Sequence, residues 1–207
     1  MNHEREPSGD RRRFLHLAAA GGALLVTGGM LRGLVAAGAN TGADAPGLIR
    51  TTPGEVLLEI FADDGRDLGA QHLPRLVLSD AQWHGRLSPA AFAILRRGGT
   101  ERAFSGAHER PASRGIYCCA GCATALYDDT TQFDSGTGWP SFWQPISPHN
   151  VIELNDTSFG MLRTEIRCAR CEGHLGHVFD DGPRPTGLRY CMNSPALRFV
   201  PRTARLS

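Results

Sequence analysis

Hydrophobic positions from residue 115 onward fall into short runs of β-forming residues, each ended by Gly, Pro, Asp or Asn. Turn signals recur about every 8 to 15 residues, which favours antiparallel sheet over alternating βαβ units. A further strand is expected at 56–60, before a turn at 63–65. The strands expected in the later region are 115–118, 151–154, 161–167, 188–191 and 197–200.

Two short helices are predicted ahead of these strands by their end signals. Ser79 can cap the first, with Gln82 three residues later as the second half of a capping box. Ser88 can cap the second, with Pro89 at its first position and Gly98 just beyond its end. The predicted fold is therefore mainly β, of the α+β class. It is a compact antiparallel β-domain with short N-terminal helices.

The N-terminal segment has the pattern of an export signal. Arg11 and Arg12, followed by Phe14-Leu15, resemble a twin-arginine signal. The apolar run at 17–26 is short and rich in Gly, which suits a signal better than a membrane span of about 20 residues; an uncleaved anchor is the alternative. Ala37-Gly38-Ala39 offers a cleavage site. We expect an exported, periplasmic or extracytoplasmic protein that meets the membrane only transiently through its signal.

These patterns divide the chain into four parts. Residues 1–39 are the expected signal peptide, and 40–75 are a linker and N-terminal extension, flexible up to about residue 53. Residues 76–202 form the main domain, and 203–207 are a tail. With 207 residues and 41% hydrophobic content, the chain can bury one ordinary core.

The charge balance argues against a nucleic-acid partner. All 22 basic side chains are arginine, and the formal net charge is only +1. Without residues 1–39, which hold 5 Arg and 3 acids, the remainder has 17 minus 18, or −1. A nucleic-acid-binding domain normally presents a basic face.

Four of the six cysteines form two C-x-x-C motifs. Cys119 and Cys122 make the first, and Cys168 and Cys171 make the second after 45 intervening residues. Two such turns supply the tetrahedral sulfur set that Zn²⁺ prefers. Local disulfides, a redox motif or an iron–sulfur site are the alternatives, but a redox C-x-x-C normally occurs once, near a βαβ unit. Zinc is favoured, and because four thiolates close its coordination shell, the ion is expected to be structural.

The other two cysteines differ in their surroundings. Cys118 adjoins Cys119, one of the expected zinc ligands, and is expected to be a small apolar residue packed in the core. Cys191 is flanked by Arg189 and Asn193, which share its face if the segment is extended. The guanidinium is expected to lower the pKa of the thiol. These residues make Cys191 a candidate nucleophile, although a packed core cysteine is the alternative.

Two histidines and a tryptophan are further candidates. His174 and His177 follow the second motif closely. They could bind a second metal, but no additional ligand at suitable spacing completes that set, or they could donate protons near a reactive site. Trp139 stands between Gly and Pro, where a tryptophan is less easily buried than in a strand.

Taken in order, the motifs resemble the B class of methionine sulfoxide reductases over residues 76 to 202. The motifs that carry the resemblance are Cys119-x-x-Cys122, Phe133-Asp-Ser-Gly-Thr-Gly-Trp-Pro-Ser-Phe142, Arg167-Cys-Ala-Arg-Cys171, His174-Leu-Gly-His-Val-Phe-Asp-Asp-Gly-Pro183 and Arg189-Tyr-Cys-Met-Asn-Ser194.

The resemblance implies a role for each matching residue. Cys191 is the nucleophile, and His177, His174 and Asn193 surround the sulfoxide. Trp139 packs against the substrate methyl group. Phe179, Arg189 and Asp180 shape the pocket, and the zinc at Cys119, Cys122, Cys168 and Cys171 is structural. The implied reaction reduces methionine-R-sulfoxide, in oxidised protein or peptide, through a Cys191 sulfenic acid.

One position departs from the pattern of some members of this family. Some members of the family carry a recycling cysteine where this chain has Thr137. We therefore expect an external thioredoxin-like thiol donor to reduce the sulfenic acid directly. A zinc-ribbon interaction module without catalysis is the alternative function. A zinc hydrolase or deaminase is excluded by the closed sulfur set, since such enzymes need an open metal position.

Overall fold

The computed structural model describes residues 47–62, 64–106, 113–160 and 162–202. The expected signal at 1–39 and tail at 203–207 lie outside the described residues. All described residues belong to one compact unit, 42–207. Within these described ranges, no helix has the length and apolar character needed to cross a membrane.

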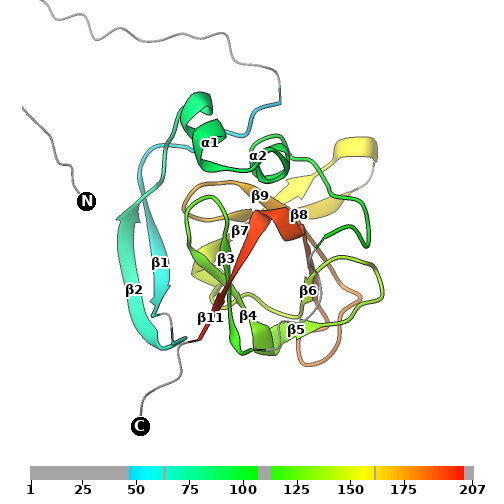
Figure 1. The fold of residues 1–207 in the computed structure, drawn as a ribbon. Coiled ribbons are helices and arrows are strands. Elements are labelled where there is room, and N and C mark those ends of the chain that lie inside the picture. The colour runs from blue at the N-terminus through cyan, green and yellow to red at the C-terminus, as the bar shows by residue number, and fades with distance from the viewer. Residues whose placement is uncertain (1–46, 63, 107–112, 161, 203–207) are drawn as a thin grey trace, which may run out of the picture. The chain divides into compact units, whose positions relative to one another are not determined.

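The strands form three antiparallel sheets (Figure 1). Strands β1 (Glu55–Phe61) and β2 (Asp67–Pro74) pair with each other. The largest sheet has the order β5-β6-β10-β9-β8-β7, and the third has the order β11-β3-β4. The bounds are β3 Gly115–Cys119, β4 Ala125–Asp128, β5 Gln132–Phe133, β6 Ser141–Phe142, β7 Val151–Asp156, β8 Arg163–Cys168, β9 His174–Phe179, β10 Arg189–Met192 and β11 Leu197–Pro201. The prediction of a mainly antiparallel fold is confirmed.

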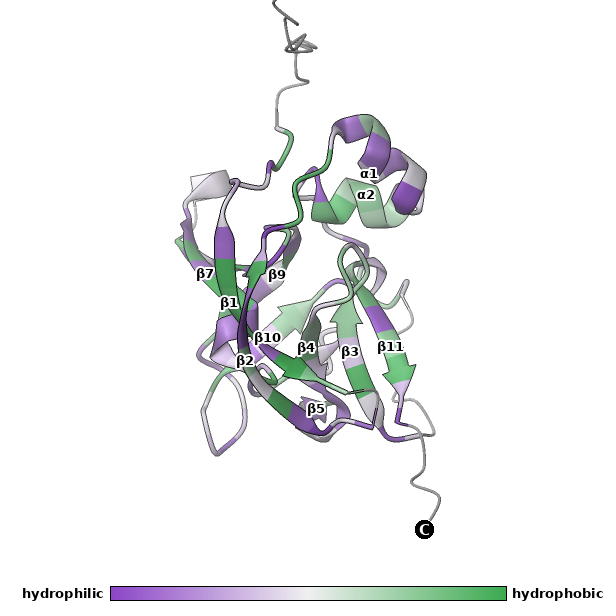
Figure 2. Cartoon of the chain, turned by 90° about the vertical axis from the view of Figure 1, so that its left-hand side faces the viewer, coloured by the Kyte–Doolittle hydropathy of each residue, from purple (hydrophilic) through white to green (hydrophobic). Residues whose placement is uncertain are grey.

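Both predicted helices form where their caps place them. Helix α1 (Asp80–Arg86) starts after Ser79, whose capping box with Gln82 is complete. Helix α2 (Pro89–Leu95) starts after Ser88 and is almost wholly apolar, whereas α1 carries several polar residues (Figure 2). Single 3₁₀ turns are η1 Asp129–Thr131, η2 Pro148–Asn150, η3 Ser158–Gly160 and η4 Ser194–Ala196.

Aromatic packing joins the two larger sheets. Tyr127 on β4 stacks on Phe142 of β6 with ring centroids 4.3 Å apart. Tyr117 on β3 meets the same phenyl ring edge-on at 5.0 Å. The hydroxyl of Tyr127 donates to the sulfur of Met192, 3.1 Å away on β10. The strand that carries Cys191 is therefore fixed against the core, because Met192 is fully buried.

The strands that the sequence pattern did not predict are β2, β4, β5, β6 and β9. Most residues of β2 are exposed, so it lacks the alternating hydrophobic pattern and forms because it pairs with β1. Residues 47–53 also differ from the expected flexible linker. Thr51 is buried and donates to the carbonyl of Cys171 at 2.6 Å. The extension is therefore part of the folded unit from residue 47 onward.

Candidate active site and metal centre

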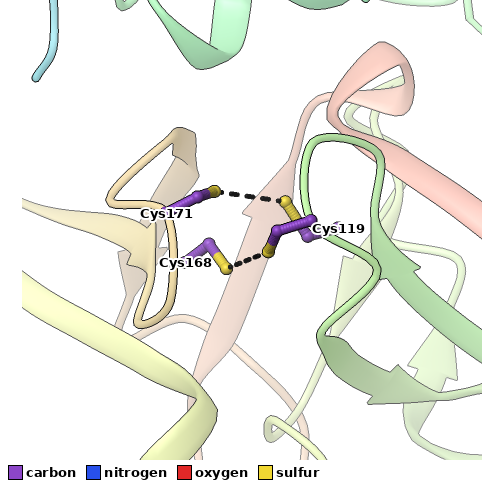
Figure 3. A group of neighbouring side chains, drawn as sticks. Cys119, Cys168 and Cys171 are labelled. Carbon is purple, nitrogen blue, oxygen red and sulfur yellow. Dashed lines mark hydrogen bonds between the residues drawn. The ribbon is translucent and has the colours of Figure 1, made fainter. Parts of the chain in front are cut away.

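Four cysteine sulfurs converge at the junction of the two larger sheets. Atoms from Cys119, Cys122, Cys168 and Cys171 all lie within 4.8 Å of one another, and all four residues are buried. The Cys119 and Cys171 sulfurs are 3.7 Å apart, and those of Cys122 and Cys168 are 3.4 Å apart (Figure 3). This sulfur set can hold one metal ion, and its donor chemistry fits zinc.

The two cysteine turns have the same backbone design. In each turn, the residue after the second cysteine has a positive φ, 62° at Ala123 and 53° at Glu172. The N–H of each residue donates to the carbonyl of the first cysteine of its own turn, Cys119 or Cys168. This repeated turn aims both thiols of a motif at one point. We refer to residues 119–124 and 168–173 as the first and second knuckles.

The helices cover the knuckles. An added Cβ at Gly121 would lie 3.4 Å from the Trp83 ring and 3.6 Å from Leu95. Arg86 donates to the Gly121 carbonyl at 2.6 Å. Hydrogen bonds from the Cys119, Cys168 and Cys171 thiols lower the pKa of Cys122 well below its ordinary value.

Cys191 occupies one row of residues across four strands. On β10 it lies directly opposite Ser141 of β6 and His177 of β9, and His177 in turn lies opposite Glu165 of β8. Residues directly opposite in antiparallel strands share a face, with Cβ atoms about 4.5 to 5.5 Å apart. The register therefore places an imidazole beside the Cys191 thiol.

A β-bulge brings the second histidine to the same site. The register between β8 and β9 shifts between Ile166 and Arg167, so that Arg167 pairs with His174. A residue three positions from His177 would otherwise point to the opposite face. Instead, the rings of His174 and His177 are 5.4 Å apart and meet edge to face. A bulge is needed to place both histidines near Cys191.

Each histidine has its own carboxylate partner. His174 Nδ1 is 2.7 Å from Glu165, and His177 Nε2 is 2.8 Å from Asp156. Among the described residues, the buried Nε2 of His174 has no hydrogen-bond partner. A carboxylate can accept only from a protonated ring nitrogen, so these contacts fix the tautomer of each neutral ring. Glu165 and Asp156 have no signal in the sequence, because strand register alone brings them to the histidines.

The pKa values of Glu165, Asp156 and His177 are all shifted from their ordinary values. Burial raises the pKa of Glu165, but hydrogen bonds from His174 and Arg167 outweigh it and lower that pKa to about 2. Hydrogen bonds from Ser158, and then from His177, hold the pKa of Asp156 far below its ordinary value. Burial lowers the pKa of His177 despite its bond to Asp156. Both carboxylates are ionised at neutral pH, whereas His177 is neutral there.

Arg189 marks one edge of the site. Its guanidinium lies 4.4 Å from the centre of the Phe179 ring and makes two 2.8 Å bonds to Asp181. Phe179 and Arg189 are paired across β9 and β10. The expected role of Asp180 in shaping the pocket stays a prediction. Asp180 is exposed, and the neighbouring Asp181 is the carboxylate that orients Arg189.

The pKa of the Cys191 thiol differs in direction from the one expected from the sequence. Burial raises the pKa of Cys191, and this effect outweighs the opposing charge of Arg189 and the hydrogen bond from Thr137. The guanidinium acts in the expected direction, but it does not determine the net shift. Thr137 belongs to a chain of hydroxyls in which Ser135 lies 2.7 Å from Thr137 and 2.8 Å from Ser141. At neutral pH, Cys191 therefore rests as a thiol.

Trp139 and Asn193 are both held by Glu101, in the loop after α2. The indole N–H of Trp139 donates to the Glu101 carbonyl at 3.2 Å, and the Glu101 N–H donates to Asn193 Oδ1 at 3.0 Å. Asn193 also donates through Nδ2 to the Leu175 carbonyl at 3.0 Å. Gly138, with φ of 85°, permits the close approach of Phe104. No motif drew attention to Glu101.

Cys118 lies in a different sheet from Cys191. It is buried on β3, opposite Arg198 of β11, and lines a cavity of about 520 Å³. The walls of that cavity come from β1, β3, β11 and the knuckles, and they include Leu58 and Arg170. The expectation that Cys118 is a buried thiol is confirmed.

Comparison with known proteins agrees with this arrangement. The SelR domain matches residues 87–201. The peptide methionine sulfoxide reductase MsrB of Bradyrhizobium diazoefficiens is 53% identical over 128 residues, which cover 62% of this chain and 92% of that protein. MsrB of Pseudomonas aeruginosa UCBPP-PA14 is 57% identical over 120 residues, 58% of this chain and 91% of the relative. MsrB of Synechococcus sp. RCC307 is 52% identical over 125 residues, which cover 60% of this chain and 92% of that relative.

The matched segment contains both knuckles, the Cys191 row and the two histidine pairs. It covers more than half of the chain, and the relatives are matched over almost their full length. The chain belongs to the SelR-domain family. Over more than half of its length it is similar to proteins named peptide methionine sulfoxide reductase MsrB.

Proposed function

We propose that this protein reduces methionine-R-sulfoxide in oxidised proteins or peptides to methionine, with Cys191 as the nucleophile. The observation that carries the proposal is the alignment of Cys191 with His177 across β10 and β9. Its relatives named peptide methionine sulfoxide reductase support the same chemistry. A zinc-ribbon interaction module is not favoured, because such a module needs neither the Cys191 row nor the carboxylate-bound histidines.

In the reaction, the sulfur of Cys191 attacks the sulfoxide sulfur, and oxygen passes to the cysteine. The sulfoxide gains two electrons and leaves as methionine. Cys191 loses two electrons and becomes a sulfenic acid, whose oxygen carries the former thiol proton. Because burial raises the pKa of Cys191, the resting thiol keeps this proton until substrate binds.

Proton donation to the sulfoxide oxygen is assigned to the histidines. A hydrogen bond to that oxygen makes the sulfur a better electrophile. His174 and His177 each have one ring nitrogen on a carboxylate, so the other nitrogen donates to the substrate oxygen when the ring is protonated to the imidazolium. Asp156 and Glu165 orient the rings and stabilise any imidazolium that forms.

The remaining pocket residues are assigned to substrate binding. Trp139 provides an apolar surface for the substrate methyl group, and epimer choice follows because the sulfoxide sulfur is stereogenic. Phe179 and Arg189, which pack on each other, line one edge of the site, and Asn193 completes it. Asp181 orients Arg189, and Asp180 is assigned to shaping the pocket.

The metal is assigned as structural Zn²⁺ bound by Cys119, Cys122, Cys168 and Cys171. Four thiolates satisfy its tetrahedral coordination, so the ion supplies folding free energy rather than catalysis. All four sulfurs are contributed by the two knuckles, which lie apart from the Cys191 row in the strand register.

For the return step, we assign direct reduction of the Cys191 sulfenic acid by a thioredoxin-like dithiol. Two donor thiols restore the cysteine and release water as they form a disulfide. Thr137 stands beside Cys191 in place of a second cysteine, and Cys118 lies in another sheet. Mass spectrometry after one turnover without reductant should find a sulfenic acid in both wild type and Cys118→Ser. A Cys118–Cys191 disulfide would contradict this step.

Export by the twin-arginine route is assigned to residues 1–39. Arg11 and Arg12 precede Phe14-Leu15 and an apolar run, and this route carries folded cargo with its metal. Changing both arginines to lysine should leave precursor in the cytoplasm. Unchanged export of that variant would contradict the assignment to periplasmic or extracytoplasmic space.

The decisive test of the function is turnover of a methionine sulfoxide peptide supplied as separate R and S epimers. Wild type should reduce the R epimer, and Cys191→Ser should not. Comparable reduction of the S epimer would contradict the proposal. Loss of activity in Cys191→Ser counts only if its zinc content and melting temperature match those of wild type.

A further inference from the structure

Glu101 makes three contacts, which reach Trp139, Asn193 and Ser194. Its carbonyl accepts from Trp139, and its N–H donates to Asn193. Its side chain accepts from the N–H of Ser194 at 2.5 Å, which fixes the backbone of residue 101. An added Cβ at Gly106 would lie 2.2 Å from Glu101 Oε2, so this loop closes tightly around the carboxylate.

We propose that Glu101 is a positioning residue that sets the distance between Trp139 and Asn193. The proposal rests on the function proposed above, since it assigns the methyl-binding surface to Trp139. If the carboxylate is removed, the backbone of residue 101 loses its anchor on Ser194. The indole and the amide then lose their fixed separation, because both are bonded to that backbone.

The test compares Glu101→Ala and Glu101→Gln with Asp129→Ala as a matched control. Gln keeps an acceptor for Ser194, whereas Ala does not. Asp129 also accepts from a backbone N–H, that of Gly115 at 3.0 Å, but in another sheet. We expect Glu101→Ala to lower kcat/KM by about 10- to 100-fold, chiefly through KM, and to weaken the R preference. Glu101→Gln should recover most of the loss.

A spectroscopic readout separates this proposal from the activity itself. The indole N–H signal of Trp139, identified with Trp139→Phe, should move in Glu101→Ala and remain in place in Asp129→Ala. Failure of the proposed function would appear as an inactive wild type, with the indole shift still measurable. The proposal is overturned if Glu101→Ala loses stability as Asp129→Ala does but keeps its kcat/KM, epimer ratio and indole signal.

A second inference comes from the N-terminal extension, which contacts residues 169 to 172 of the second knuckle. Residues 47–76 lie before residue 87, where the SelR match begins. Three contacts reach backbone carbonyls: Thr51 to Cys171, Arg75 to Ala169 at 3.1 Å, and the Leu76 N–H to Arg170 at 2.9 Å. A fourth contact, between Arg75 and Glu172, is 2.6 Å long, and both side chains are mostly buried.

The same extension is tied to the first knuckle through Asn150. The side chain of this fully buried residue pairs with both backbone groups of Glu59 on β1, at 2.8 and 2.9 Å. It also donates to the Ala125 carbonyl, just after the first knuckle, at 2.8 Å. Its own carbonyl accepts from the Ala169 N–H at 3.0 Å. β1 and β2 lie beside the sheet that contains the first knuckle (Figure 1).

We infer that residues 47–62 and 64–76 form a clamp that holds the two knuckles together and slows zinc release. A four-thiolate site loses its ion when one knuckle moves away and exposes the sulfurs to water or a competing ligand. Residues of the clamp donate hydrogen bonds to backbone carbonyls of the second knuckle. The knuckle therefore cannot open without breaking those hydrogen bonds. This role goes beyond the proposed catalysis and does not depend on it.

The clamp is tested with Arg75→Ala, against Arg66→Ala as the matched control. Arg66 belongs to the same extension, but its side chain is 60% exposed and pairs loosely with Asp64. Zn²⁺ transfer from the full chain to a coloured chelator should be about tenfold faster in Arg75→Ala, since a buried charge-assisted bond is lost. Adding Thr51→Val should increase the rate further. Arg66→Ala should match wild type.

Hydrogen exchange provides a second readout that needs no chelator. The Glu172 amide, bonded to Cys168, should exchange faster in Arg75→Ala than in wild type, whereas the Ala123 amide should change less. Equal zinc release and equal Glu172 exchange in wild type and Arg75→Ala would overturn the clamp. Partial unfolding would instead accelerate exchange throughout the core, and that result would also count against it.

Discussion

Replacing Glu165 with Gln should remove a defined amount of stability that depends on pH. The change keeps the shape of the side chain and an oxygen acceptor for His174, but it removes the charge. In the folded protein, His174 and Arg167 lower the pKa of Glu165 from 4.5 to about 2. Each tenfold change in proton affinity corresponds to about 1.4 kcal/mol, so the ionised carboxylate contributes at most about 3 kcal/mol at neutral pH.

The direction of the pH dependence follows from the lowered pKa. The unfolded chain binds the proton more tightly than the folded protein does. The contribution is therefore complete above pH 4.5 and disappears as the pH falls toward about 2. At neutral pH, the variant should melt up to about 6 to 12 °C below wild type. The difference between the two proteins should shrink steadily through the acid range.

The assay is urea unfolding of both proteins at several pH values between neutrality and pH 3. Zinc thiolates are also protonated in acid, but this affects both proteins, so only the difference in unfolding free energy is read. A constant difference between wild type and Glu165→Gln across the whole range would refute the reasoning. It would mean that the carboxylate acts through its shape and hydrogen bonds rather than its charge.

Four further predictions concern the metal centre and the pocket. Cys168→Ser should lower zinc content and melting temperature together, as measured by metal analysis and calorimetry; equal melting at lower zinc content would contradict it. His177→Ala should slow single-turnover reduction by about 10²- to 10⁴-fold. Burial lowers the pKa of His177, so the wild-type rate attributable to its protonated form should rise as pH falls through neutrality, and the variant should lose that rise. Trp139→Ala should raise KM and reduce the preference for the R epimer in peptide assays; an unchanged epimer ratio would count against the methyl-binding role. Thr137→Val removes a hydrogen bond to the Cys191 sulfur, so the thiol pKa measured by alkylation rate should rise; an unchanged pKa would contradict that contact.

The sequence alone determined the features that depend on short-range chemistry. Ser79 and Ser88 specify helix starts because a capping side chain acts within three residues. The C-x-x-C spacing specifies paired thiols because one tight turn aims both at the same point. Short runs of β-forming residues between turn signals predicted strands β1, β3, β7, β8, β10 and β11, because these signals also act within a few residues.

Only the tertiary structure decided the contacts that depend on strand register and burial. The bulge between β8 and β9 brings His174 beside His177, and pairing across strands supplies Glu165 as its partner. No local sequence pattern encodes the bulge or the pairing of Glu165 with His174, because strand register is set by the whole sheet. The pKa of Cys191 illustrates the same division. The neighbouring Arg189 is visible in the sequence, but burial, which outweighs its charge, exists only once the chain has folded.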